Sequence, residues 1–538
     1  MPIFFNLESH LWIAYLLFFN GYLAQVILRT WSIEYARLTH TFEAQVLGAF
    51  FISVGFNGLA LLLLQLWGQP FAVMKGLLPI ISLSLLITVW RKTPSIAAAF
   101  NFELHWARLL LYSFVFVILF INGGLIEQIS DAWWHMSLAN KIALESSYEL
   151  SAGHLTGMPT RYYPPLWHGN LALLKVLSGE PLVVLWNSFT AWGASIKVMA
   201  FFLFALALTK NKLTALFAAL LFVLLPGVGN AYLRVSAWPS HIAYAAWFVC
   251  LALAVQFFDA SGRASSWRNW FSLDSGVQIG VGLALALAIY FSHKAELLWF
   301  ALAMYFYWLA LLIRRAWCGE QYVSRVEPAF LLLSVFGVLL TCGWLFLSAS
   351  RVIEGYADGS WDERIALVLS PALTLVLLFV AFVGKPAGQG WRRLLTLGIV
   401  AIAAVSIDTQ HALSLFNPDL AYPIKADRQW ALSAPGWFGG ALKIPGWHLQ
   451  LREGLLYSGV LALPLSILLT WYWPSRTTIM LAGNCCFVLL ICLSPYFYHG
   501  FYELLDYHSP WRISVLVWHP IVFAFLITKL IHAVRQSQ

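Results

Sequence analysis

Asp131 and His135 are the residues whose types and spacing are best suited to chemistry. In the stretch SDAWWHMSLANKIAL, Asp131, Trp134, His135 and Leu138 fall at positions i, i+3, i+4 and i+7 of a helix. Residues four apart share one helix face, so a carboxylate and an imidazole would lie side by side. Asp131 follows an apolar run and would sit at a membrane–water boundary, where it can act as a general base. The alternative is an interfacial helix that keeps its polar face in water.

A second group with chemical potential is SHKAE, Ser292 to Glu296, which lies between two apolar runs. It places His293 and Lys294 in a very short turn. A lysine is a compact partner for phosphate, and a cation there would stabilise the charge of a departing phosphate group. The alternatives are that Lys294 extends its charged end to the membrane surface and that His293 caps a helix.

Other polar residues lie in segments that we predict to be loops on the same side of the membrane. The segment RYYPPLWH contains Arg161, Tyr163 and His168, and its two prolines enforce a turn. Further along the chain, Arg428, His499 and Glu503 occur in segments rich in Trp, Tyr, Gly and Pro. We predict that these six residues and His135 contact substrate, because aromatic rings beside charged groups suit a polar ligand. The alternative is a structured surface loop without chemistry.

The composition predicts a membrane protein. The chain of 538 residues is 61% hydrophobic and only 10% charged, with a mean hydropathy of +0.76, which suits lipid as a solvent. The net charge of +8 is not gathered into a Lys/Arg run, so nucleic-acid binding is not expected. Six cysteines without Cys-x-x-Cys spacing do not indicate a disulfide framework. Nucleotide-binding glycine motifs are absent from the sequence, as are HExxH and GxSxG.

The apolar runs predict an all-α polytopic membrane protein with about fifteen transmembrane helices. Short interfacial helices and loops at one membrane face complete this prediction. The predicted spans are 11–29, 46–67, 71–90, 106–125, 181–209, 212–229, 238–258, 274–291, 296–313, 329–349, 365–384, 394–413, 455–473, 477–496 and 513–532. Lys197 and His519 fall inside predicted spans, and we do not include either in the predicted site.

The placement of Lys and Arg predicts the orientation. Basic residues gather in short loops on one side, which would be cytoplasmic. The loop 127–178 would then face the other side. The sequence contains no Asn-x-Ser/Thr acceptor site, which suits a bacterial inner membrane with the site facing the periplasm.

We predict three parts along the chain. Residues 1–90 would add three N-terminal transmembrane helices, and residues 91–315 would form a membrane core with its first periplasmic loop at 127–178. Residues 316–538 would contribute further transmembrane helices with periplasmic loops at 350–364, 414–452 and 497–512.

The acid after a span, the short helix and the Tyr-Pro-Pro-Leu turn at 163–166 resemble the first loop of the GT-C superfamily of membrane glycosyltransferases. Lipid A aminoarabinose transferases, protein O-mannosyltransferases and pilin arabinosyltransferases are the members to which the chain is similar. The resemblance implies a polyprenyl-phosphate sugar as donor and inversion at the anomeric carbon. It also implies that Asp131 is the base. A pentose such as arabinofuranose is the sugar that it favours. The acceptor would be a periplasmic protein such as pilin, a glycan or a lipid.

One residue departs from the pattern of that superfamily. Its members commonly carry an Asp-Glu pair in this loop, and the second acid is replaced here by Ala132. A hard divalent cation needs several oxygen ligands, so we predict neither a metal nor another cofactor.

Two other functions remain as alternatives. The first is a ligase or polymerase that moves a whole diphosphate-linked oligosaccharide, similar to O-antigen ligases. The second is a flippase or transporter for a lipid-linked sugar, which would carry charged residues near the middle of the membrane and an internal repeat. A non-catalytic scaffold would not need an acid, a histidine and an arginine in one loop.

Overall fold

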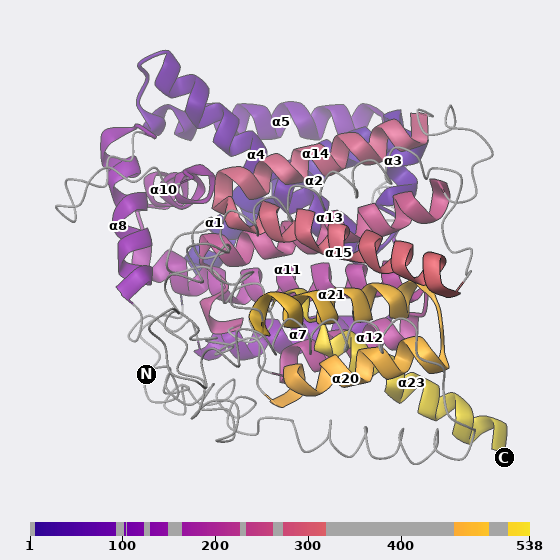
Figure 1. The fold of residues 1–538 in the computed structure, drawn as a ribbon. Coiled ribbons are helices and arrows are strands. Elements are labelled where there is room, and N and C mark those ends of the chain that lie inside the picture. Colours follow the sequence, from indigo (N-terminus) through magenta and orange to yellow (C-terminus); the bar gives the residue numbers. More distant parts are fainter. Residues whose placement is uncertain are drawn as a thin grey trace, which may run out of the picture.

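The computed structural model is an all-helical bundle in the residues that it describes, which are 6–92, 102–103, 105–122, 130–148, 164–225, 233–261, 273–318, 457–493 and 515–537. These residues contain no β-strand, and their isolated β-bridge joins Thr41 to Glu103. Figure 1 shows most helices running in roughly one direction, as expected of a membrane bundle.

The helices and helical turns have the following bounds: α1 Leu7–Ala14, η1 Tyr15–Phe19, α2 Asn20–Trp31, α3 Ile33–Leu38, α4 Phe42–Leu66, η2 Phe71–Val73, α5 Met74–Lys92, α7 Trp106–Asn122, α8 Ser130–Glu145, α10 Leu166–Ser178, α11 Leu182–Thr209, α12 Lys212–Leu224, η3 Leu233–Val235, α13 Pro239–Ser261, α14 Leu273–His293, α15 Ala295–Cys318, α20 Tyr457–Tyr472, α21 Arg476–Leu493 and α23 His519–Ser537.

Six helical segments among the described residues are long and apolar enough to cross a membrane: Leu7–Trp31, Phe42–Leu66, Phe71–Lys92, Leu182–Thr209, Pro239–Phe257 and Gly276–His293. Each lies where the sequence predicts a span. Three further predicted spans appear as shorter apolar helices, Trp106–Asn122, Lys212–Leu224 and Glu296–Leu311. Among the described residues, the structure therefore supports six membrane-spanning segments and not the predicted number of about fifteen. The spans predicted at 329–349, 365–384 and 394–413 lie outside the described residues.

Helix starts follow from local capping. The Asn6 side chain accepts hydrogen bonds from the backbone of Glu8 and Ser9 at the start of α1, and Thr41 caps α4 through the backbone N–H of Ala44. Pro239 occupies the first position of α13, where its missing N–H costs nothing. Helix α11 ends at Lys210, which adopts the left-handed conformation.

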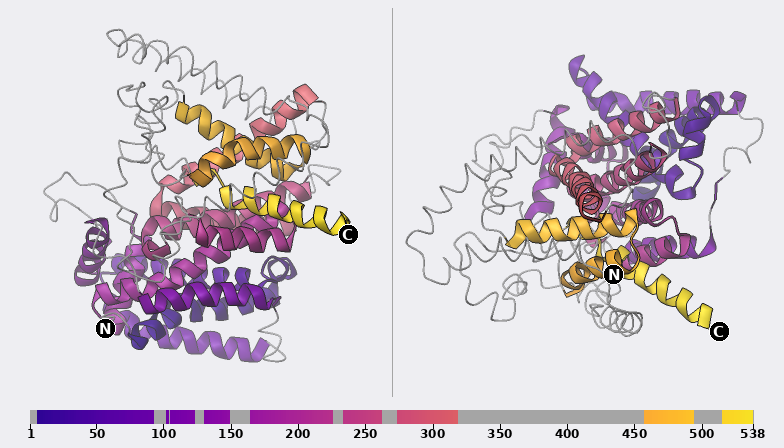
Figure 2. Two further views of the ribbon diagram at one scale, coloured as in Figure 1. Left: turned by 90° about the horizontal axis from the view of Figure 1, so that it is seen from below. Right: turned by 45° about the vertical axis from the view of Figure 1, so that its right-hand side comes forward.

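The core of the bundle surrounds α11, which packs against α13, α12, α7 and α4. Its sides are lined by buried aromatic residues, among them Trp186, Phe189 and Phe201. Figure 2 shows the indigo N-terminal helices and the orange and yellow C-terminal helices on opposite sides of the bundle, with the magenta helices between them.

The N-terminal helices pack directly onto the rest of the chain. The Asn57 side chain on α4 donates to Asn170 Oδ1 on α10 at 3.0 Å, and Asn170 donates to the backbone of Val54. Arg108 on α7 donates to both carboxylate oxygens of Glu43 on α4. The predicted division at residue 90 is not tested by these contacts, but they join the two sides of that boundary.

Helix α8 runs across one end of the bundle, roughly perpendicular to α4, α5 and α11 (Figure 1). An interfacial helix would have this orientation, and that prediction stays untested. We call this end of the bundle the α8 end. The other end, where α5 and α11 finish, carries many of the described basic residues and is called the basic end. Basic residues at helix ends there are Arg91 and Lys92 at the end of α5, Lys210 after α11, Lys212 and Arg476 at the starts of α12 and α21, and Arg535 in the last turn of α23.

Candidate functional site

The candidate site at the α8 end begins with the first turn of α8. The structure describes the backbone of Asp131, which is the second residue of that helix, and His135 follows one turn later. The predicted helix and its i, i+4 spacing are thus present. The side chain of His135 is buried, with 6% of the residue exposed.

His135 contacts His168, a residue 33 positions later in the chain. His135 Nδ1 lies 3.0 Å from His168 Nε2, and His168 Nδ1 lies 3.3 Å from the backbone carbonyl oxygen of Pro164. Because a carbonyl oxygen only accepts, His168 Nδ1 carries the proton. In the neutral ring Nε2 then accepts, and His135 Nδ1 donates. The prediction that both histidines contact substrate stays untested, but the structure joins them to each other.

His168 is fully buried, and its environment disfavours the charged ring. Burial lowers the pKa of His168 to about 4, and the nearby charge of His293 lowers it further, against the opposing effect of the Pro164 carbonyl. His168 is therefore neutral at physiological pH and serves as a hydrogen-bonding group in the folded protein.

This shift predicts acid sensitivity. The folded-state pKa of His168 lies below its value of about 6.5 in an unfolded chain, so its contribution to stability is complete above pH 6.5. It is lost as the pH falls from about 6.5 towards 4, by about 3 kcal/mol in total. The thermal unfolding temperature in detergent should therefore fall less between pH 7.5 and 4.5 for His168→Gln than for the unaltered protein. Equal acid sensitivity of the two proteins would contradict this assignment.

The turn between α14 and α15 brings His293 and Glu296 together. His293 Nδ1 hydrogen-bonds Glu296 Oε2, and the carboxylate is fully buried, whereas Lys294 is exposed. His293 and Lys294 were predicted from the sequence as site residues, whereas Glu296 was not. The missed signal was the i, i+3 spacing of an acid and a histidine across a turn within an apolar region.

A second buried polar pair lies deeper in the bundle. Lys197 Nζ on α11 is 2.7 Å from His241 Nδ1 on α13, and Lys197 is fully buried. The Trp238 ring lies 6.3 Å from that of His135 and 6.2 Å from that of His241. Lys197 was named from the sequence and left out of the predicted site, and His241 was missed. An ionisable residue inside a membrane bundle is a functional candidate by default.

The start of α13 is held by close contacts with the core. Trp167 Nε1 on α10 donates to the carbonyl oxygen of Ala237 at 2.7 Å. A Cβ atom at Gly193 on α11 would lie 2.6 Å from the carbonyl oxygen of Ser236, closer than side chains can approach. The glycine therefore lets the segment before α13 lie against α11, which places His241 beside Lys197.

A long apolar groove has one end at residues that shortly precede His168 and His293 in the chain. It has a volume of about 1340 Å³ and lies along α4, with α11, α13 and α14 on its other sides. At the α8 end it is lined by Tyr148, Pro165, Leu166 and Phe291, and at the basic end by Tyr35, His40 and Lys210. Gly55 and Gly280 also line it, and neither has another atom within 4 Å of where its Cβ would be.

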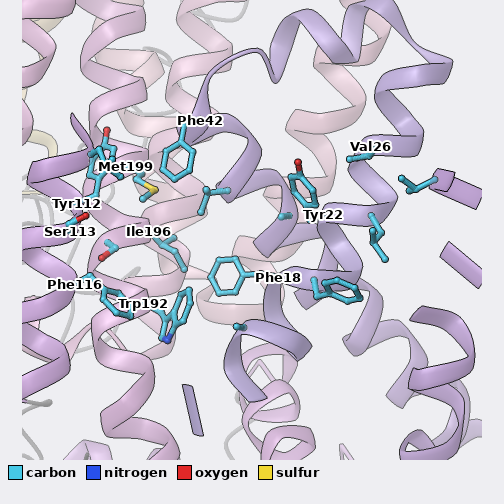
Figure 3. Close-up of a pocket in the computed structure, with 18 of the residues that line it drawn as sticks. Phe18, Tyr22, Val26, Phe42, Tyr112, Ser113, Phe116, Trp192, Ile196 and Met199 are labelled. Carbon is cyan, nitrogen blue, oxygen red and sulfur yellow. The ribbon is translucent and has the colours of Figure 1, made fainter. Parts of the chain in front are cut away.

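A separate apolar cavity of about 1190 Å³ lies on another side of α4. Figure 3 shows Phe18 and Tyr22 from the N-terminal helices opposite Phe116 of α7 and Trp192 of α11. Its polar atoms include the hydroxyl groups of Tyr112 and Ser113, and Tyr112 donates to Glu43. This lining suits an acyl chain but offers no acid–base chemistry.

The other predicted site residues cannot be placed. Arg161, Tyr163, Arg428, His499 and Glu503 lie outside the described residues. Among the described residues no group of three or more His, Cys, Asp or Glu side chains could hold a metal ion.

Comparisons with protein-family models, curated proteins and solved structures found no match to this chain.

Proposed function

We propose that this chain is an integral membrane glycosyltransferase that moves a sugar from a polyprenyl-phosphate donor to a periplasmic protein, glycan or lipid. The observation that carries the proposal is a juxtaposition at the α8 end. The helix of Asp131, the His135–His168 pair and the His293–Glu296 turn lie together where an apolar groove begins.

The groove supports a lipid donor with a long chain. It follows α4 from Ala44 to Leu62, which is eighteen steps of 1.5 Å or about 27 Å. A phospholipid tail spans one leaflet, about half of a hydrocarbon core that is about 30 Å thick. A polyprenyl chain is long enough to occupy the whole groove while its phosphate stays near Pro165 and Phe291.

The distribution of charge supports the orientation. Cytoplasmic ends of membrane proteins carry an excess of Lys and Arg, and such residues gather at the basic end. The α8 end then faces the periplasm of a bacterial inner membrane, where lipid-linked sugars meet exported acceptors.

In the proposed reaction, Asp131 accepts the proton of an acceptor hydroxyl. The hydroxyl oxygen forms a bond to the anomeric carbon as the bond from that carbon to the phosphate oxygen breaks. The polyprenyl phosphate leaves with the electron pair, and Lys294 and His293 stabilise its charge. Attack from the face opposite the leaving group inverts the anomeric carbon.

The test is transfer by the purified full-length protein in liposomes that contain a synthetic polyprenyl-phosphate arabinofuranose, mannose or glucose. The added acceptor is periplasmic extract from cells that lack the gene. Mass spectrometry should find one added sugar on a protein, glycan or lipid, and only with the protein present. The absence of any added sugar with all three donors would contradict the proposal.

A flippase for a lipid-linked sugar is the second candidate. Two observations favour it: the groove extends from one end of the bundle to the other, and Lys197 and His241 are buried between those ends. The same liposomes distinguish the two functions. A flippase would move a fluorescent lipid-linked sugar between leaflets without adding sugar to any acceptor.

A further inference from the structure

Glu296 is a buried carboxylate with an unused acceptor atom. Oε2 is bonded to His293, but Oε1 has no hydrogen-bond partner among the described residues, although Glu296 is fully buried. Buried polar atoms are nearly always hydrogen-bonded, and burying a carboxylate costs several kcal/mol. An acceptor without a partner at this depth is stabilised when a donor group reaches it, and a hydroxyl group of a ligand is such a donor.

Glu43 shows how this chain satisfies a carboxylate with a structural role. Arg108 Nη1 donates to both of its oxygens at 3.1 Å, and the hydroxyl of Tyr112 donates to Oε1 at 2.8 Å. Both carboxylates are fully buried. Glu43 thus uses both oxygens to join α4 to α7, whereas Glu296 leaves Oε1 without a partner among the described residues.

Glu296 lies within the candidate site. Its partner His293 is the last residue of α14, which packs against α10, and His168 on α10 contacts His135 on α8 at 3.0 Å. His135 is one turn from Asp131 on α8. Helix α10 therefore packs against both α8 and α14, the helices that carry His135 and His293.

The charge of Glu296 restricts what can bind there. A carboxylate repels phosphate and accepts hydrogen bonds from hydroxyl groups. The phosphate of a donor must then lie on the exposed side of the turn, towards Lys294, while the sugar lies towards the buried carboxylate.

We propose that Oε1 of Glu296 accepts a hydrogen bond from a hydroxyl group of the donor sugar, while His293 holds the carboxylate in place through Oε2. This inference rests on the proposed function and makes Glu296 a residue that selects the sugar. The site would then contain two acidic residues from different parts of the chain, Asp131 on α8 and Glu296 after the α14–α15 turn.

The experiment compares binding of farnesyl phosphate with binding of farnesyl phosphate that carries arabinofuranose, mannose or glucose. The full-length protein in nanodiscs should bind one of the sugar-bearing lipids at least about 10-fold more tightly than the bare lipid. Glu296→Gln and Glu296→Ala should lose most of this preference and keep their affinity for bare farnesyl phosphate. A merely structural role would weaken binding of both lipids alike.

The double variant Glu43→Gln/Arg108→Met is the matched control, because it alters an equally buried carboxylate without leaving a buried cation unpaired, and it should keep the preference for the sugar. If both Glu296 variants fold and also keep the preference, the inference is wrong and the proposed function stands. If the unaltered protein prefers none of the three sugar-bearing lipids, the proposed function itself is contradicted, and the inference with it.

Discussion

Asp131→Asn should reduce sugar transfer by at least about 100-fold and leave the helical fold intact. Removal of a general base costs about two to four orders of magnitude in rate, and Asn keeps the shape of the side chain without its basicity. Asp131 is the second residue of α8, and Asp and Asn have nearly the same volume, so the helix should form in the variant as well. The measurement is the initial rate of transfer in liposomes, with circular dichroism as the check on folding.

Glu145→Gln is the control for this prediction. Glu145 is an exposed acid at the other end of the same helix, 3.7 Å from Lys141. An exposed ion pair of this kind contributes little to stability, so the variant should transfer sugar at the normal rate. A folded Asp131→Asn protein with full activity would remove Asp131 from the reaction.

Arg108→Met should lower the free energy of unfolding by about 3–5 kcal/mol. It leaves the fully buried carboxylate of Glu43 without its cation, and breaking a buried ion pair on one side costs this much. Arg108 Nη2 also donates to the backbone carbonyl of Glu103 at 3.1 Å, so the variant loosens the segment before α7 as well. Unfolding of the purified protein in detergent measures the loss.

The double variant Glu43→Gln/Arg108→Met identifies the cause. It no longer contains a buried unpaired charge and should recover more than half of the stability that Arg108→Met loses. Arg91→Met replaces an exposed arginine at the end of α5 and should change stability by less than about 0.5 kcal/mol. If the double variant were no more stable than Arg108→Met, the cost would come from lost packing, such as the contact of Arg108 with the Phe202 ring at 5.2 Å.

Local features of the sequence predicted helix positions well. The run predicted to span 181–209 appears as α11, and the helix that contains Asp131 and His135 appears as α8. Apolar length alone overestimated α12, which was predicted to reach residue 229 and ends at Leu224. Leu225 is extended, as residues before a proline tend to be, and Pro226 follows it.

Contacts between distant parts of the chain could not be predicted. Spacing placed His293 and Lys294 in a turn, but which of them would find a partner depended on the depth of that turn in the bundle. Lys197 and His241 are 44 residues apart and meet because Gly193 lets the segment before α13 approach α11. Such pairs follow from how whole helices pack, which a single sequence does not specify.

The position of α8 across the ends of the membrane helices has a kinetic consequence. If the chain acts as proposed, a site at this end of the bundle would meet its lipid donor by diffusion within the plane of the bilayer and would not need to extract it into water. Turnover would then follow the mole fraction of the donor among the surrounding lipids. At a fixed amount of donor, diluting the membrane with inert phospholipid would slow the reaction, whereas enlarging the aqueous volume would leave the encounter with the donor unchanged.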